Sequence, residues 1–155
     1  MEYVLVQENS YEKAKKQISK NKEKKIIFTS NDDELNRKIL EKLLINILLI
    51  NQAERKDFQK QRNSGLNHVL AKLAKKNNVA IGINFDEIIK SEGNEKAKIL
   101  ARIRQNINLC NKNKLKMFFI VKETKNKRNA YDIKSLELVL GMPTWMTKDL
   151  ELIVA

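Results

Sequence analysis

The chain reads RNSGLNHVLAKLAKKNNVAIG over residues 62–82. Leucine recurs there at positions 66, 70 and 73, which is the spacing of one helix face, and the pattern ends at two asparagines. A β-rich run follows at once. The stretch therefore predicts a helix over Ser64–Asn77 that passes into a strand over Val79–Asn84, the repeating unit of an α/β domain with a mainly parallel sheet.

The same alternation runs through most of the 155 residues. The other expected strands are Tyr3–Val6, Lys25–Phe28, Leu43–Ile50 and Lys116–Val121. The other expected helices are Tyr11–Lys20, Asp32–Lys42 and Glu95–Lys112. After Lys122 we expect a loop to Ala130, a short helix over Ser135–Leu140 and a final strand over 150–154. A complete TIM barrel has eight βα units and about 250 residues. Five to six mainly parallel strands thus predict an abbreviated TIM-barrel-like α/β repeat or an open sheet, in a single domain.

Two helix starts are expected from capping residues. Asn31 followed by Glu34 predicts a capping box, because such side chains satisfy the free backbone amides of the first helical turn. Ser64 is expected to play a similar part before Gly65. Both expectations rest on local sequence alone.

The composition predicts a polyanionic partner. Lys and Arg number 31 against 19 Asp and Glu, which gives a formal charge of +12 and a pI near 9.8. Nucleic acid is the first candidate. A membrane is disfavoured, because the longest apolar run, Leu43–Ile50, is far short of the roughly 20 residues of a spanning helix. The acidic start of the chain does not resemble a signal peptide, so we expect a cytoplasmic protein.

The positive charge is concentrated in three segments. Residues 96–116 contain seven Lys and Arg and no acid, and a core stripe from Leu100 to Cys110 leaves Lys98, Arg102 and Arg104 on the expected solvent flanks. The helix after Gly65 carries four residues on one face: His68, Lys72, Lys75 and Lys76. The third segment is the loop Lys122–Lys134. A single charged helix face is usually only solvated, but three segments together favour contacts with phosphates.

Residues that could carry chemistry are few. One histidine and one cysteine cannot form a zinc site, and Cys110 is expected to be a buried thiol. Three acids near strand ends could hold Mg²⁺, although helix starts explain two of them better: Asp57, Asp86 and Glu87. His68 has three possible roles: an RNA contact, a cap interaction or general acid-base catalysis. Trp145 is expected to pack rather than stack on a base.

The 62–82 stretch resembles the signature of the RNase P protein component 3 family, in which a G-[LI]-[ND]-H-V-L-A-K-L helix leads into an N-x-A-[IL]-G strand. Two weaker matches follow in the same order. Lys98–Asn108 resembles the basic helix of that family, and Tyr131–Lys134 with Leu140–Met142 resembles its D-[VL]-R and L-G-M elements. The resemblance covers about residues 25–142. It implies a barrel like that of the metal-dependent phosphoesterases, in a subunit that binds RNA and leaves catalysis to the RNA.

This chain also departs from the family pattern. One or two βα units are expected to be missing at the N-terminus, which puts barrel closure in question. The S-L-R-P element after the Gly82 strand is replaced by residues 84–87, NFDE, and the S-S-[GA] element is replaced by residues 122–124, KET. Lys134 keeps a positive charge where the family has arginine.

The resemblance implies an RNA-binding subunit of ribonuclease P that assists removal of the 5′ leader from precursor tRNA. The implied partners are the ribonuclease P RNA, precursor tRNA and the ferredoxin-like RNase P protein component 2, with Mg²⁺ on the RNA and no catalytic or metal site on the protein. The alternatives are a metal-dependent phosphoesterase and a general RNA-binding or ribosomal scaffold. The candidate RNA-binding residues are Arg62, Gly65, His68, Lys72, Lys76, Arg102, Arg104 and Lys134.

Overall fold

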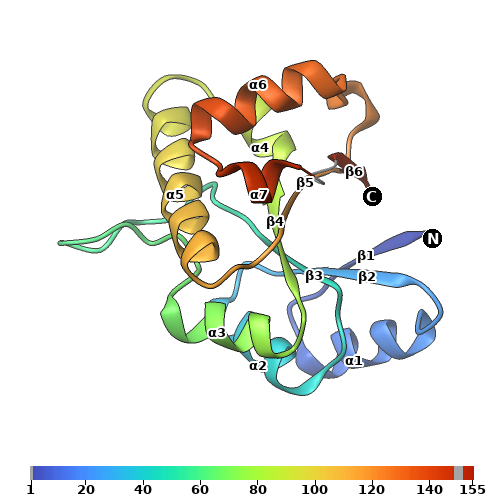
Figure 1. The fold of residues 1–155 in the computed structure, drawn as a ribbon. Coiled ribbons are helices and arrows are strands. Elements are labelled where there is room, and N and C mark those ends of the chain that lie inside the picture. Colours follow the sequence, from blue (N-terminus) through green and yellow to red (C-terminus); the bar gives the residue numbers. More distant parts are fainter. Residues whose placement is uncertain (1, 149–151) are drawn as a thin grey trace.

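The computed structural model describes residues 2–148 and 152–155. Within them, six strands form one sheet: β1 (Tyr3–Gln7), β2 (Lys25–Thr29), β3 (Ile47–Ile50), β4 (Ala80–Asn84), β5 (Met117–Val121) and β6 (Leu152–Val154). The helices are α1 (Tyr11–Lys20), α2 (Asp33–Lys42), α3 (His68–Lys76), α4 (Phe85–Lys90), α5 (Gly93–Lys112), α6 (Ala130–Leu140) and α7 (Thr144–Thr147), with a 3-10 turn η1 (Thr124–Asn126). The strands lie in chain order and every neighbouring pair is parallel (Figure 1). The predicted α/β repeat is confirmed.

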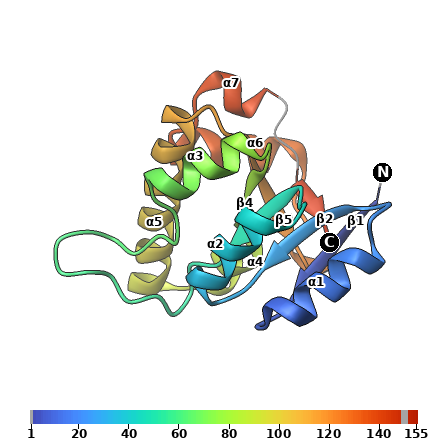
Figure 2. The ribbon, with the colours of Figure 1, turned by 90° about the horizontal axis from the view of Figure 1, so that it is seen from below.

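The sheet is curled into a half-barrel, with the helices around its outer side (Figure 2). Its inner face carries a cluster built from strand residues: Ile27, Ile47, Leu49, Ile120 and Ile153, with Tyr3, Leu5, Ala80 and Phe118 at its margin. A hydrogen bond of 3.1 Å from Lys122 Nζ, just after β5, to Gln7 Oε1 of β1 spans the same curl. The abbreviated TIM-barrel-like architecture is therefore confirmed.

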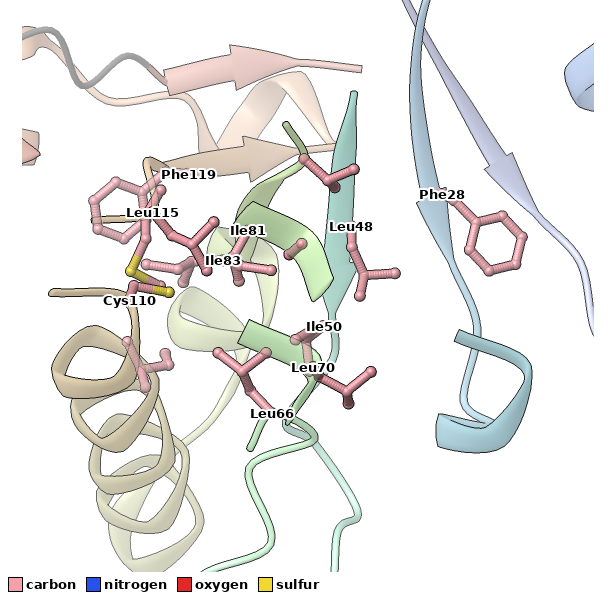
Figure 3. Packing of buried hydrophobic residues seen from close by; sticks show 14 of the residues in the cluster. Phe28, Leu48, Ile50, Leu66, Leu70, Ile81, Ile83, Cys110, Leu115 and Phe119 are labelled. Carbon is pink, nitrogen blue, oxygen red and sulfur yellow. The ribbon is translucent and has the colours of Figure 1, made fainter. Parts of the chain in front are cut away.

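The larger hydrophobic core lies between the outer face of the sheet and the helices. Cys110 of α5 lies beside Phe119 of β5 in this layer, and Leu70 of α3 lies beside Ile50 of β3 (Figure 3). Phe28 of β2 belongs to the same core farther along the sheet. All four residues of β3 are buried, because a central parallel strand is covered on both faces. This is why its sequence is continuously apolar and does not alternate.

Several predicted helix and strand boundaries were wrong. The expected strand Leu43–Ile50 begins only at Ile47, because α2 continues to Lys42 and the next residues form the connection, in which Leu44 is exposed. The α2 cap is Asp32 and not Asn31, since its carboxylate accepts from the amides of residues 34 and 35 at 3.0 and 3.3 Å. The predicted helix from Ser64 begins at His68, with Asn67 as its cap.

The last quarter of the chain is more helical than expected. The predicted helix Ser135–Leu140 begins five residues earlier, at Ala130, because Asn129 Oδ1 accepts from the Asp132 amide at 2.9 Å and caps it there. The predicted final strand is confirmed over Leu152–Val154; its expected first residues, 150 and 151, lie outside the described part of the chain. In that described part, no helix has both the length and the apolar character required to cross a membrane.

Candidate nucleic-acid interface

A long loop, residues 51–67, connects β3 to α3 and projects beyond α5 (Figures 1 and 2). Arg102 of α5 holds its base. The guanidinium donates to Asp57 Oδ1 at 2.9 Å, to the Gln52 carbonyl at 3.0 Å and to the Arg55 carbonyl at 2.8 Å. The bond from Arg102 to Asp57, together with a bond from the Asn63 amide, holds the pKa of Asp57 below its ordinary value. Arg102 is 1% exposed, so its expected place on the solvent flank is wrong.

The burial of Arg102 has a local cause. The inward face of α5 carries Ile99, Ile103 and Ile107, and Arg102 and Asn106 share it. The loop lies against this face and presents backbone carbonyls and Asp57, which are suitable acceptors for a guanidinium. The sequence itself shows that Arg102 lies within the apolar stripe of this helix. Its hydrogen-bond acceptors on the loop could not be predicted, because they are distant in the chain.

A second arginine fixes the other side of the loop base. Arg55 donates to both carboxylate oxygens of Asp33, at 2.8 and 2.9 Å, and to the Asn51 carbonyl. Gly65 makes this position possible: its φ is +76°, and a Cβ there would lie 2.5 Å from Arg55 Nη2 and 2.6 Å from Ile50 Cγ2. Gly65 therefore supports the base of the loop.

Arg62 and Arg104 line one surface hollow. Its volume is about 530 Å³, and its other lining residues are Ala97, Leu100, Ala101, Gln105 and Asn108 of α5. Gln105 Nε2 donates to the Arg62 carbonyl at 3.1 Å and to Ser64 Oγ at 3.1 Å, which fastens the loop beside the helix. Two candidate residues 42 positions apart are thus brought to one site. The hollow combines two cations with amides and a small apolar floor.

The outer side of α3 carries another part of the predicted set. His68, Lys72 and Lys76 are exposed and follow one another at i, i+4 and i+8, so they form one ridge. Lys75 lies on the same side, and its Nζ reaches the Lys114 carbonyl at 3.0 Å. The N-cap role considered for His68 belongs instead to Asn67, whose Oδ1 accepts from the Leu70 amide at 2.9 Å. His68 does not cap the helix, and it is exposed to solvent.

Lys134 lies on a different helix, α6. Its Nζ is 4.0 Å from Glu137 Oε2, and the Glu137 side chain is almost wholly buried. Burial raises the pKa of Glu137, and the nearby ammonium opposes this shift. Lys134 thus compensates a buried carboxylate on its own helix, while half of its side chain is exposed.

The carboxyl ends of the strands, where TIM-barrel enzymes place catalytic groups, are lined here by amides. Asn84 Nδ2 donates to Asn51 Oδ1 at 2.9 Å, and Asn51 Nδ2 donates to Thr29 Oγ1 at 3.1 Å. The acids considered as Mg²⁺ ligands accept bonds from the protein. Asp86 accepts from the Lys122 amide and Asn126, both at 2.8 Å, and Glu87 accepts from the Gln52 amide at 2.8 Å. Among the described residues, no group of three or more His, Cys, Asp or Glu is placed to hold a metal ion.

Two further expectations concern the end of α5. Cys110 is buried, and burial raises the pKa of its thiol to about 12, so the prediction of a core thiol is confirmed. Trp145 donates from Nε1 to Asn111 Oδ1 at 2.8 Å, and Lys114 Nζ lies 5.1 Å from its ring centre. The ring lies at the end of α5 and is 36% exposed, so it is not part of the buried core.

The fold and surface define a TIM-barrel-like α/β protein with a basic hollow beside α5 and a basic ridge on α3. Residues 5–150 match the family described as RNase P subunit p30, and the chain belongs to this family. The resemblance seen in the sequence is thereby confirmed.

Relatives and a solved structure agree with this assignment. Ribonuclease P protein component 3 of Methanococcus maripaludis strain C7 is 34% identical over 105 residues, which are 68% of this chain and 42% of the relative. The Methanocaldococcus jannaschii protein of the same name is 32% identical over 121 residues, 76% of this chain and 49% of the relative. A chain in the cryo-EM structure of archaeal ribonuclease P with mature tRNA superposes with a TM-score of 0.79 at 26% identity, over 94% of this chain and 62% of that chain. The matched region thus spans about half the length of these curated relatives.

Proposed function

We propose that this protein is an RNA-binding subunit of an archaeal-type ribonuclease P and assists the catalytic RNA in removing the 5′ leader of precursor tRNA. The observation that carries the proposal is the family match over residues 5–150. The superposition on a chain of archaeal ribonuclease P supports it. The partners on this proposal are the ribonuclease P RNA, precursor tRNA and the ferredoxin-like protein component 2, and the Mg²⁺ needed for cleavage sits on the RNA.

The protein's contribution, on this proposal, is electrostatic. A charge of +12 offsets phosphate repulsion where RNA segments are brought together. The contacts come from two places: the hollow of Arg62 and Arg104, and the ridge of His68, Lys72 and Lys76. Gly65 and Arg102 act indirectly by supporting the loop that carries Arg62.

The alternative of a metal-dependent phosphoesterase rests on the barrel-like fold alone, which is a weak basis because function depends on sites. The acids that could have served it are Asp57, Asp86 and Glu87, and each accepts a hydrogen bond from a backbone amide. Phosphoesterase activity of the purified protein that requires a divalent metal and no RNA would support this alternative and contradict our proposal.

Reconstitution tests the proposal directly. The full chain is combined with cognate ribonuclease P RNA and component 2, and leader cleavage is measured at moderate Mg²⁺. We expect a rise in cleavage rate when the protein is added. No rise would refute the proposed role. Equal binding to many unrelated RNAs, with no preference for ribonuclease P RNA, would favour a general RNA-binding scaffold.

Lys72→Ala tests the ridge. Because Lys72 is exposed, the variant should fold normally and bind ribonuclease P RNA more weakly. The log-log salt dependence of binding should lose about 0.7 to 0.9 units if one phosphate contact is removed. Lys16→Ala, an exposed lysine on α1, is the matched control and should leave affinity and slope unchanged. A Lys72 variant with wild-type affinity and slope would show that the ridge does not contact RNA.

A further inference from the structure

The tip of the loop between β3 and α3 has an unusual composition. Residues 58–62 read FQKQR, and all five are exposed. Phe58 is 61% exposed, although a phenyl ring gains most when it is buried. Two cations and two amides accompany it, and the tip contains no acid. A large aromatic ring held in water among cations suggests a partner that offers both flat apolar faces and negative charge.

The tip is held in place by its stem. Asp57 Oδ1 accepts from the Asn63 amide at 3.0 Å, which joins the residues on either side of the tip. The same oxygen accepts from buried Arg102 at 2.9 Å, and Gln105 holds the Arg62 carbonyl at 3.1 Å. The loop therefore presents Phe58 from a stem that is fixed to α5. Such preorganisation lowers the entropy lost on binding.

The charges of the tip continue into the hollow on α5. Arg62 ends the tip and lines the hollow together with Arg104. Within the described residues, neither Lys60 nor Arg62 takes part in an ion pair. A chain of phosphates can follow Lys60, Arg62 and Arg104, while a base lies on the ring of Phe58. Every base has a face that stacks on an aromatic ring, so this arrangement suits unpaired RNA without a fixed sequence.

We propose that residues 58–62 form a stacking contact for single-stranded RNA, in which Phe58 receives an unpaired base and Lys60 and Arg62 hold the flanking phosphates. This inference rests on the proposed function, because it assigns one surface of an RNA-binding subunit to unpaired nucleotides. Paired RNA cannot use the ring in the same way, since its bases are already stacked within the helix.

The test uses the full chain and three probes: a fluorescently labelled single-stranded RNA of mixed sequence, the same RNA annealed to its complement, and an abasic strand of equal length. The variants are Phe58→Ala, Phe58→Leu and Phe58→Trp. Loss of one stacked base corresponds to roughly a five- to hundredfold loss of affinity. We expect this loss for the alanine and leucine variants on the single strand only, with near wild-type binding by the tryptophan variant. The salt slope should not change, because no phosphate contact is removed.

The outcomes separate this inference from the proposed function. If the wild-type protein binds the single strand and Phe58→Ala or Phe58→Leu binds it equally well, the stacking contact is refuted and the proposed function stands. Equal losses on the abasic strand would also refute stacking. If Phe58→Ala binds RNA normally but no longer binds component 2, the tip is a protein contact instead. If the wild-type protein binds no RNA, the proposed function fails as well. Circular dichroism shows that each variant is folded.

Discussion

Replacing Arg102 by alanine should destabilise the whole domain. The change removes a guanidinium that is 1% exposed and that donates to Asp57 and to the carbonyls of Gln52 and Arg55. Removing one partner of a buried ion pair typically costs about 3 to 5 kcal/mol. The side chain of Asp57 is 32% exposed, so water can solvate the released carboxylate and the cost falls toward the lower end, about 3 kcal/mol. The free energy of unfolding should therefore drop by a large fraction of the total for a small domain.

Urea denaturation followed by circular dichroism measures this loss. With a slope of about 2 kcal/mol per molar urea, the midpoint should fall by about 1.5 M. Arg104→Ala is the matched control, because Arg104 lies two residues away on the same helix and is exposed. Its stability should stay within about 0.5 kcal/mol of wild type, while its affinity for RNA falls. An Arg102 variant that unfolds at the wild-type midpoint and has a reduced salt slope would refute the reasoning and return Arg102 to the RNA contacts.

The pH dependence gives a second measurement of the same interaction. The pKa of Asp57 is lowered from 3.8 in the folded protein by its hydrogen bond with Arg102. A lowered carboxyl pKa contributes stability that is present above the unfolded value and is lost as the pH falls through the folded value. The difference in stability between wild type and Arg102→Ala should hence shrink below about pH 4. A difference that stays constant through this range would show that the carboxylate does not contribute.

Two other residues give independent tests. Gly65→Val should cost roughly 1 to 3 kcal/mol for the positive φ alone and more because its Cβ would lie 2.5 Å from Arg55 Nη2; Gly141→Val, at φ +83° with nothing within 4 Å of the added Cβ, is the control and should cost less in the same urea assay. Cys110, whose thiol pKa is raised by burial to about 12 from 9.0, should react with iodoacetamide at pH 8 only after urea is added. Rapid alkylation of the folded protein would contradict the buried position. The raised thiol pKa also means that stability is lost as the pH rises from about 9 toward 12.

The parallel α/β repeat could be predicted from sequence because its signals are local. Residues 62–82 carry a helix period, a break and an apolar run within a short span, and these patterns follow from backbone geometry. The same span carried the family resemblance. The N-cap of α2 could not be predicted in this way. Asn31 and Asp32 are both good capping residues, and which one caps the helix depends on the backbone conformation of the preceding connection.

Only the tertiary structure decided which arginine is buried and which is exposed. Arg102 and Arg104 belong to the same basic stretch, yet one is buried and the other exposed. The difference arises from Asp57, which is 45 residues away in the chain and reaches Arg102 only when the loop packs on α5. The curl of the sheet likewise depends on segments that are distant in the chain, because the contact that spans it joins residues 115 positions apart. Local period and composition thus determined the elements and their charge, while contacts between distant segments determined which charges face solvent, because burial depends on what covers a side chain.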